Sequence, residues 1–223
     1  MPLVANAPGL WTVDQDLRIL GAQLGSRASI LRLSDGRLAL HSPVPFTAED
    51  AAAIDALGEV ALIIAPNLFH HLSLAAAAAR WPQARVVGAP GLAEKVRGLP
   101  SMAPLPSSGT LAPGLEVKAV GGMAKVGEHV FFHPESGSLL ITDLCFHFVE
   151  VDHWWTRTFM GLNNAYGRLT LSRLGRTMID DKGALRQGVD AVLAWPFERI
   201  GLCHGRPIEK DGRARLTEAF AWL

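Results

Sequence analysis

The chain has 223 residues, of which 49% are hydrophobic, enough for one large core, and no stretch resembles a linker, so we expect a single domain over residues 1–223. Its 21 Lys and Arg balance 21 Asp and Glu, without a basic stripe, so neither nucleic acid nor a membrane is expected as a partner. Cys145 and Cys203 form no CxxC spacing, the N-terminus has no leader pattern, and no apolar run reaches the roughly 20 residues of a spanning helix. We expect a soluble cytoplasmic protein.

The first half of the chain predicts strands followed by strand-helix units. An antiparallel group is expected at residues 18–20, 28–33 and 38–41, with a Ser-Asp-Gly turn before the last strand. Thr47 and Asp50 form a capping box, so a helix is predicted over residues 48–57, and Gly58 ends it. The apolar run 60–65 is typical of a strand covered on both faces. Helices are then expected at 71–80 and 91–97, on either side of a strand at 85–89.

The second half predicts another strand group with its own helices. Residues 98–114 contain four of the 14 prolines, so an irregular crossing loop is expected there. Strands are predicted at 115–120, 130–133, 139–142 and 199–203, helices at 184–193 and 213–222, and an aromatic-rich covering segment at 146–166. Each strand group needs one face covered by helices and the other by its counterpart. The predicted fold is therefore an α+β, four-layer αββα sandwich.

The candidate chemical residues all lie at predicted strand ends. They are His41, the pair His70 and His71, Asp143, and His204. Strand ends in layered α/β proteins are where functional side chains converge, because the scaffold fixes them and the loops leave them accessible. Each residue alone is weak evidence, since a buried histidine is often only a packing residue.

The order of elements and motifs from about residue 28 to 205 resembles the metallo-β-lactamase superfamily. In that superfamily an H-x-H-x-D-H segment follows a strand, and residues 64–72, Ile-Ala-Pro-Asn-Leu-Phe-His-His-Leu, occupy this place with His71 as the terminal histidine. Leu-Ile-Thr-Asp143 resembles the strand that delivers the bridging aspartate, and Leu-Cys-His204-Gly resembles the final His-Gly. The Ser-Pro after His41, the Ala-Pro-Asn-x-x-His-His and the Thr-Asp-Leu look like a divergent, DUF4336-like branch.

The departures from the motif imply a reduced metal site. Pro66 and Leu68 stand at the first two histidines and Lys125 at the third, unless His129 takes that place, so the first metal loses its ligands. The second site would keep His71, Asp143 and His204, with His70 in place of an aspartate. This set suits one divalent ion, Zn²⁺ first, with Fe²⁺ or Mn²⁺ as alternatives.

The resemblance implies a metal-dependent hydrolase for a small ester, thioester, amide or phosphoester, and the sequence leaves open whether the protein is a monomer or a homo-oligomer. His41, or whichever of His70 and His71 does not bind the ion, would then be the general acid or base. The alternative is a non-catalytic relative that uses the same cleft to bind a small molecule or a protein partner. A nucleophilic Cys203 is a weaker alternative, because neighbours on a strand point to opposite faces. An oxidoreductase would need a second metal or a flavin.

Overall fold

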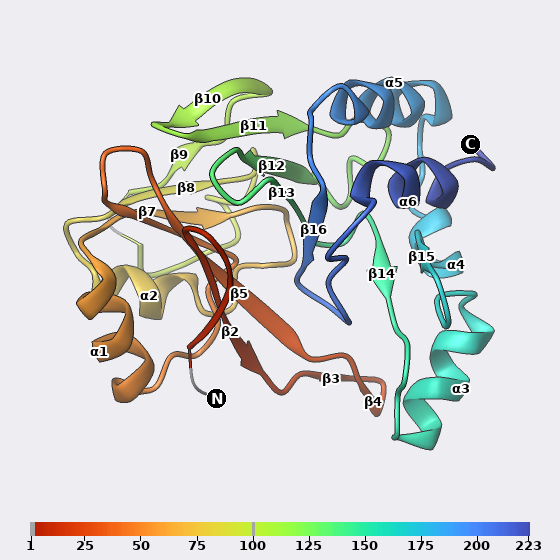
Figure 1. Ribbon diagram of the computed structural model, residues 1–223, viewed down its shortest axis with the longest axis horizontal. Coiled ribbons are helices and arrows are strands. Elements are labelled where there is room, and N and C mark those ends of the chain that lie inside the picture. The colour runs from red at the N-terminus through yellow and green to blue at the C-terminus, as the bar shows by residue number, and fades with distance from the viewer. Residues whose placement is uncertain (1–2, 100) are drawn as a thin grey trace.

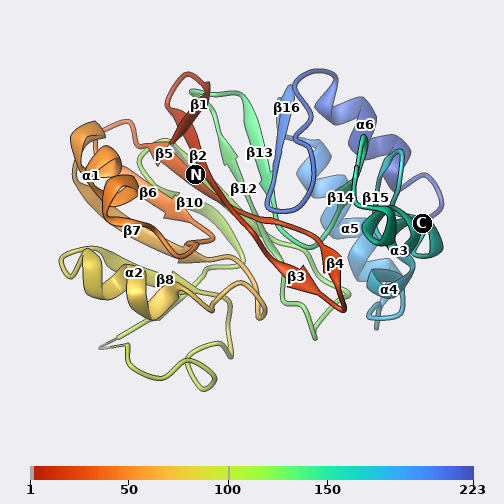
Figure 2. The same cartoon turned by 90° about the horizontal axis from the view of Figure 1, so that it is seen from below.

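The computed structural model describes residues 3–99 and 101–223, and Figure 2 shows its four layers side by side. The first sheet has seven strands in the order β1-β2-β5-β6-β7-β8-β9. Their bounds are β1 (Val4–Ala7), β2 (Leu10–Gln15), β5 (Ser26–Arg32), β6 (Leu38–His41), β7 (Val60–Ala65), β8 (Arg85–Gly88) and β9 (Ala103–Pro104). The strands from β1 to β6 pair antiparallel, and β6, β7, β8 and β9 are parallel.

The second sheet has five strands in the order β10-β11-β12-β13-β16. Their bounds are β10 (Ser108–Ala112), β11 (Leu115–Ala119), β12 (His129–His133), β13 (Ser138–Ile141) and β16 (Arg199–Leu202). The last pair, β13 and β16, is parallel and places Ile141 opposite Leu202, so the residues that follow these two strands leave the sheet at the same edge.

Helices cover the outer face of each sheet (Figures 1 and 2). On the first sheet lie α1 (Ala48–Leu57) and α2 (Leu74–Arg80), and on the second lie α5 (Lys182–Leu193) and α6 (Gly212–Ala219). Alternation along the strands divides the core: Leu38 and Leu40 of β6 pack toward α1 and α2, whereas Ala39 faces the second sheet. The predicted αββα sandwich is confirmed.

Small elements surround one end of the sandwich. A two-stranded arm, β3 (Arg18–Ile19) with β4 (Ala22–Gln23), extends from the first sheet toward α3 (Trp154–Leu162), as Figure 2 shows. The other small elements are α4 (Arg173–Arg176) and the pair β14 (Phe146–His147) with β15 (Leu169–Thr170). The arm and α3 are joined by hydrogen bonds from Gln23 N to Thr156 Oγ1 and from Trp155 Nε1 to Leu20 O.

Several local predictions were wrong. Residues 91–97 form turns instead of a helix, and the expected crossing loop contains β9 and β10, although Pro100 lies outside the described residues. The strands β1 and β2 were missed, and α2 begins at Leu74, three residues later than expected. The predicted bounds of α1, β6 and β7 are confirmed. Among the described residues no helix has the length and apolar character needed to cross a membrane.

Candidate metal centre

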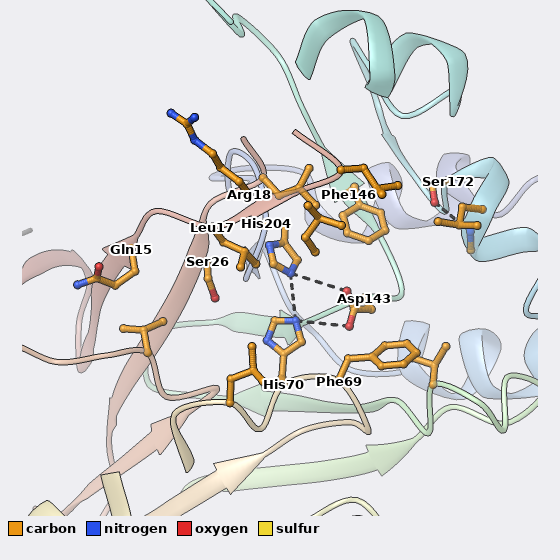
Figure 3. Close-up of a pocket in the computed structure, with 18 of the residues that line it drawn as sticks. Gln15, Leu17, Arg18, Ser26, Phe69, His70, Asp143, Phe146, Ser172 and His204 are labelled. Carbon is orange, nitrogen blue, oxygen red and sulfur yellow. Dashed lines mark hydrogen bonds and ion pairs between the residues drawn. The ribbon is translucent and has the colours of Figure 1, made fainter. Parts of the chain in front are cut away.

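Three side chains that follow strand ends meet between the two sheets (Figure 3). His70 lies in the turn between β7 and α2, Asp143 follows β13, and His204 follows β16. Their candidate donor atoms lie within 4.8 Å of one another. His70 Nε2 is 3.0 Å from His204 Nε2 and 3.4 Å from Asp143 Oδ2, and His204 Nε2 is 3.8 Å from Asp143 Oδ1. The three parts of the chain therefore bring two imidazole nitrogens and one carboxylate to one point.

The remaining nitrogen of each histidine ring has a partner that orients the ring. His204 Nδ1 lies 2.6 Å from the carbonyl oxygen of Gly25, which can only accept, so Nδ1 carries the proton and a neutral His204 has a lone pair on Nε2. Burial, and then the charge of His70, lowers the pKa of His204 to about 4, which keeps the ring neutral at pH 7. His70 Nδ1 is 2.8 Å from Ser42 Oγ, a partner of the kind that fixes metal-binding histidines.

The loop that carries His204 is held on two sides. Arg27 of β5 donates hydrogen bonds to the carbonyl oxygens of Leu202 and Gly205, each at 2.9 Å, and forms an ion pair with Asp14. Gly205 has φ of +81°, and a Cβ there would lie 2.4 Å from the carbonyl oxygen of His147, so a glycine is required directly after His204. These contacts fix the position of His204 relative to the first sheet.

Asn67 connects the other two members of the cluster. Its Oδ1 accepts hydrogen bonds from the backbone N–H groups of Phe69 and His70, which shapes the turn that presents the His70 ring. Its Nδ2 donates to Asp143 Oδ2 at 2.7 Å and to Glu128 Oε2 at 2.8 Å. The buried amide therefore separates two carboxylates and uses all its hydrogen-bonding capacity.

Glu128 lies beneath the cluster and fixes the backbone of Asp143. Its Oε1 accepts from the N–H groups of Thr142 and Asp143, at 2.8 and 3.1 Å. Burial and the neighbouring Asp143 raise the pKa of Glu128, while the N–H donors oppose that shift. Burial would also raise the pKa of Asp143, but His70, together with His204 and Asn67, brings it below its usual value, so Asp143 is ionised.

The structure corrects the expected role of His71. It is His70, and not His71, whose donor atom joins Asp143 and His204, because the Asn67 turn directs adjacent side chains differently. The H-x-H-x-D-H pattern therefore ends one residue earlier than the sequence resemblance implied. In that register Asn67, and not Leu68, replaces the second histidine, and Phe69 replaces the aspartate. His71 is partly buried and lines the adjoining cavity.

Three other residues with roles suggested by the sequence lie outside the cluster or are unsuited to those roles. His41 was expected as a general acid or base, but it is 1% exposed, packs edge-on against Phe131 and does not line the cavity. Burial, followed by the charge of His70, lowers its pKa to about 3. Burial raises the pKa of the Cys203 thiol to about 12, so this thiol is not a reactive nucleophile. His129, the alternative third ligand, lies outside the cluster at the start of β12, where its ring contacts the Gly127 carbonyl.

Sequence reasoning missed Asn67, Glu128 and Ser42. Asn67 was quoted only as part of the Ala-Pro-Asn segment, without a role of its own. Glu128 gave one signal, since it is an acidic residue directly before the fully buried strand β12. Ser42 is 1% exposed and has φ of 54°, an unusual backbone conformation for a residue other than glycine. Such conformations cluster at functional sites, but only the coordinates reveal them.

The cluster opens into a cavity of about 600 Å³. The arm, the 69–73 turn, α3 and α4 form its walls, and Phe146 stacks on His204 with ring centroids 5.9 Å apart. The side chain of Asp143 is 16% exposed and that of His70 10%, so both are accessible from the cavity.

The donor set fits one divalent cation. Two imidazole nitrogens with oriented rings and one ionised carboxylate are ligands that Zn²⁺, Fe²⁺ and Mn²⁺ accept. Three protein ligands are also the number that catalytic zinc sites use, since a fourth position must remain for water or substrate. Asn67 places an N–H donor against Asp143 where a second cation would need a ligand, which argues against two ions.

Comparisons with known proteins agree with this architecture. Residues 8–94 match the family model described as "Domain of unknown function (DUF4336)". A metallo-β-lactamase from Pontibacter korlensis is 17% identical with a TM-score of 0.68, and the match covers 98% of this chain and 96% of that one. FIM-1 from Pseudomonas aeruginosa, in its mono-zinc form, is 14% identical with a TM-score of 0.67, covering 98% and 95%.

A third structure of the same fold belongs to a protein with a different name. The metal-soaked Flv1 flavodiiron core from Synechocystis sp. PCC6803 is 13% identical with a TM-score of 0.66, covering 99% of this chain and 60% of that one. No curated protein matches the sequence significantly. Identities this low show the fold alone. The chain is a divergent protein of the metallo-β-lactamase fold, and its residues 8–94 carry the DUF4336 match.

Proposed function

We propose that the protein is a hydrolase that uses a single divalent metal ion, held by His70, Asp143 and His204. The observation that carries the proposal is the meeting of three donor atoms within 4.8 Å on the wall of a cavity large enough for a small molecule. An ion bound there supplies Lewis-acid chemistry, polarising a carbonyl or phosphoryl oxygen and lowering the pKa of water. Zn²⁺ is the first candidate, and Fe²⁺ or Mn²⁺ the alternatives.

The protein's own side chains have separate tasks in this proposal. Gly25 O and Ser42 Oγ fix the two rings, and Asn67 holds the carboxylate of Asp143. His71 lines the same cavity outside the cluster, and burial, followed by the charge of Lys95, lowers its pKa. A neutral imidazole beside the substrate can accept a proton, so His71 replaces His41 as the candidate general base.

The adjacent histidines provide a matched test. We expect wild-type protein purified without chelator to retain about one Zn²⁺ per chain, measured by mass spectrometry of the metals. His70→Ala and His204→Ala should lose it, because each removes a donor atom, whereas His71→Ala should keep it and lower kcat for an ester substrate about 100-fold or more. Loss of the metal in His71→Ala with retention in His70→Ala would refute the ligand set. Absence of metal from the wild type, even with excess Zn²⁺, would favour the non-catalytic alternative.

A further inference from the structure

The cavity beside the metal cluster has an apolar wall. Its lining side chains are mostly aliphatic or aromatic and come from separate parts of the chain, among them Leu17, Val44, Val126, Phe146, Phe159 and Met160. Outside the cluster and His71, the charged residues among the described lining are Asp16 and Arg18. Figure 3 shows the Arg18 side chain directed away from His204. Asp16 and Arg18 are both exposed, so outside the cluster and His71 the described lining contains no buried charged side chain that could pair with an ionic group of a substrate.

The entrance of the cavity is apolar as well, although it faces solvent. Eight large apolar side chains stand out as exposed in the described chain, and five of them line this one cavity. These five are Ile19, Leu20, Phe69, Leu72 and Leu174. Leu72 is 83% exposed and Leu20 is 74% exposed, so neither side chain is packed into the core. Exposed apolar side chains that gather at one place mark a binding surface.

The apolar surface is continuous from this rim to the metal cluster. Phe69 belongs to the rim and is the neighbour of His70, and Phe146 stacks on His204 inside. A ligand that covers both the rim and the inner wall is therefore extended and apolar, with its reacting group at the cluster.

We infer that the substrates are esters or thioesters of fatty acids, with the acyl carbonyl at the cluster and the hydrocarbon chain along the wall and rim. This inference deepens the proposed hydrolase function and rests on it. Hydrolysis adds the oxygen of water to the acyl carbon and breaks the bond to the alcohol or thiol, which leaves with one proton. The fatty acid is released as a carboxylate, and the second proton of the water passes to solvent.

Binding of neutral amides to metal-free protein tests the preference for a longer hydrocarbon chain without any catalysis. Each methylene that moves from water into the cavity should tighten binding about fourfold, which is ~0.8 kcal/mol. Octanamide has four methylenes more than butanamide, so calorimetric titration should give a Kd lower by about two orders of magnitude. Equal affinities for the two amides would overturn the inference.

Two leucines on the surface give a matched pair of variants. Leu174, 51% exposed, lines the cavity, whereas Leu162, 64% exposed at the end of α3, does not. Leu174→Asp should weaken octanamide binding about tenfold or more and leave butanamide nearly unchanged, while Leu162→Asp should leave both unchanged. Leu17→Asp extends the test to the inner wall. If Leu162→Asp and Leu174→Asp weaken octanamide binding equally, the hydrocarbon chain does not lie along Leu174, and the assignment is refuted.

A hydrolysis assay separates this inference from the proposed function. With Zn²⁺ bound, p-nitrophenyl octanoate should be cleaved with a higher kcat/KM than the butyrate. If neither ester nor any thioester is cleaved although octanamide binds as expected, the hydrolase proposal fails and the chain-binding cavity stands. If short esters are cleaved as well as long ones and octanamide does not bind, the hydrolase stands and the fatty-acyl assignment fails.

Discussion

At the scale of single residues, Asn67 determines how the candidate centre is organised. One buried amide shapes the turn before His70 and separates the carboxylates of Asp143 and Glu128. A histidine at this position would offer a metal ligand, whereas the amide offers two N–H donors to two acids. In the proposed single-metal centre, the side chain that offers no ligand to a second ion therefore also holds the turn of His70 and the carboxylate of Asp143.

The change Asn67→Asp tests this role with almost no change in shape. Aspartate keeps an acceptor for the turn, but it replaces the N–H donors by a third carboxylate facing Glu128 and Asp143. We expect the free energy of unfolding of metal-free protein at pH 7 to fall by about 3 kcal/mol, since a buried charge loses its compensation. Urea denaturation measures this loss.

Asn6 provides the control, because its amide also makes two hydrogen bonds but is exposed. Asn6→Asp should change the unfolding free energy by less than about 0.5 kcal/mol. If Asn67→Asp lowers the unfolding free energy no more than Asn6→Asp does, a third carboxylate beside Glu128 and Asp143 has no special cost, and the role given to Asn67 is wrong.

Three residues of the candidate centre could be identified from the sequence, but the sequence did not show which of the two adjacent histidines joins the cluster. His70, Asp143 and His204 were all named, because strand ends are visible as apolar runs that stop at a polar residue. His70 and His71 are adjacent and chemically identical, so only the turn formed by Asn67 decides which ring reaches the cluster. The expected use of His41 failed for a related reason, since the alternation of β6 directs it between the sheets.

At the scale of elements, the arm β3-β4 depends on α3 for its position. The two strands are only two residues each, too short to be stable alone, and their contact with α3 includes the bond from Gln23 N to Thr156 Oγ1 at 2.8 Å. The arm forms one wall of the cavity, so its docking also controls access to the cluster.

The change Thr156→Val should release the arm. It keeps the size of the side chain but removes the acceptor for Gln23 N–H and the hydroxyl next to His153. We expect the Gln23 amide to exchange with deuterium about fivefold faster, because a net hydrogen bond contributes roughly 1 kcal/mol. Thr158→Val changes an exposed threonine of the same helix and should leave this amide unaffected. Unchanged protection in Thr156→Val would mean that other contacts hold the arm.

Elements with strong local signals were predicted well, and the others were not. The capping box of α1 and the continuous apolar run of β7 gave the observed bounds, because both signals depend on neighbouring residues only. In contrast, β2 pairs with β5, and the arm separates these two strands in the sequence. Strand β9 has only two residues and is a strand only because it pairs with β8. Residues 91–97 have helix-forming side chains, but they form turns after β8.

At the scale of the whole molecule, the two sheets enclose ionisable groups that respond to pH in opposite directions. Burial lowers the pKa of His41 from 6.5 to about 3 and raises that of Glu128 from 4.5 to about 7. As the pH falls below 6.5, the unfolded chain protonates His41 and the folded chain does not, so stability is lost. Over the same range Glu128 has the opposite effect, so the pH profile of the wild type alone cannot separate them.

The variant His41→Leu isolates the histidine. Neither ring nitrogen of His41 has a hydrogen-bond partner in the described structure, so an apolar replacement should be neutral or stabilising by about 1 kcal/mol at pH 7.5. Between pH 6.5 and 5 His41 costs the wild type a further ~2 kcal/mol of stability, which is 1.5 pH units at about 1.4 kcal/mol each, and this cost is absent from the variant, while the effect of Glu128 is common to both. Urea unfolding at both pH values should therefore show the advantage of His41→Leu growing by about 2 kcal/mol as the solution is acidified. Parallel pH profiles for the two proteins would mean that His41 is protonated or hydrated between the sheets, and that the inter-sheet core at this end of the sandwich is not dry.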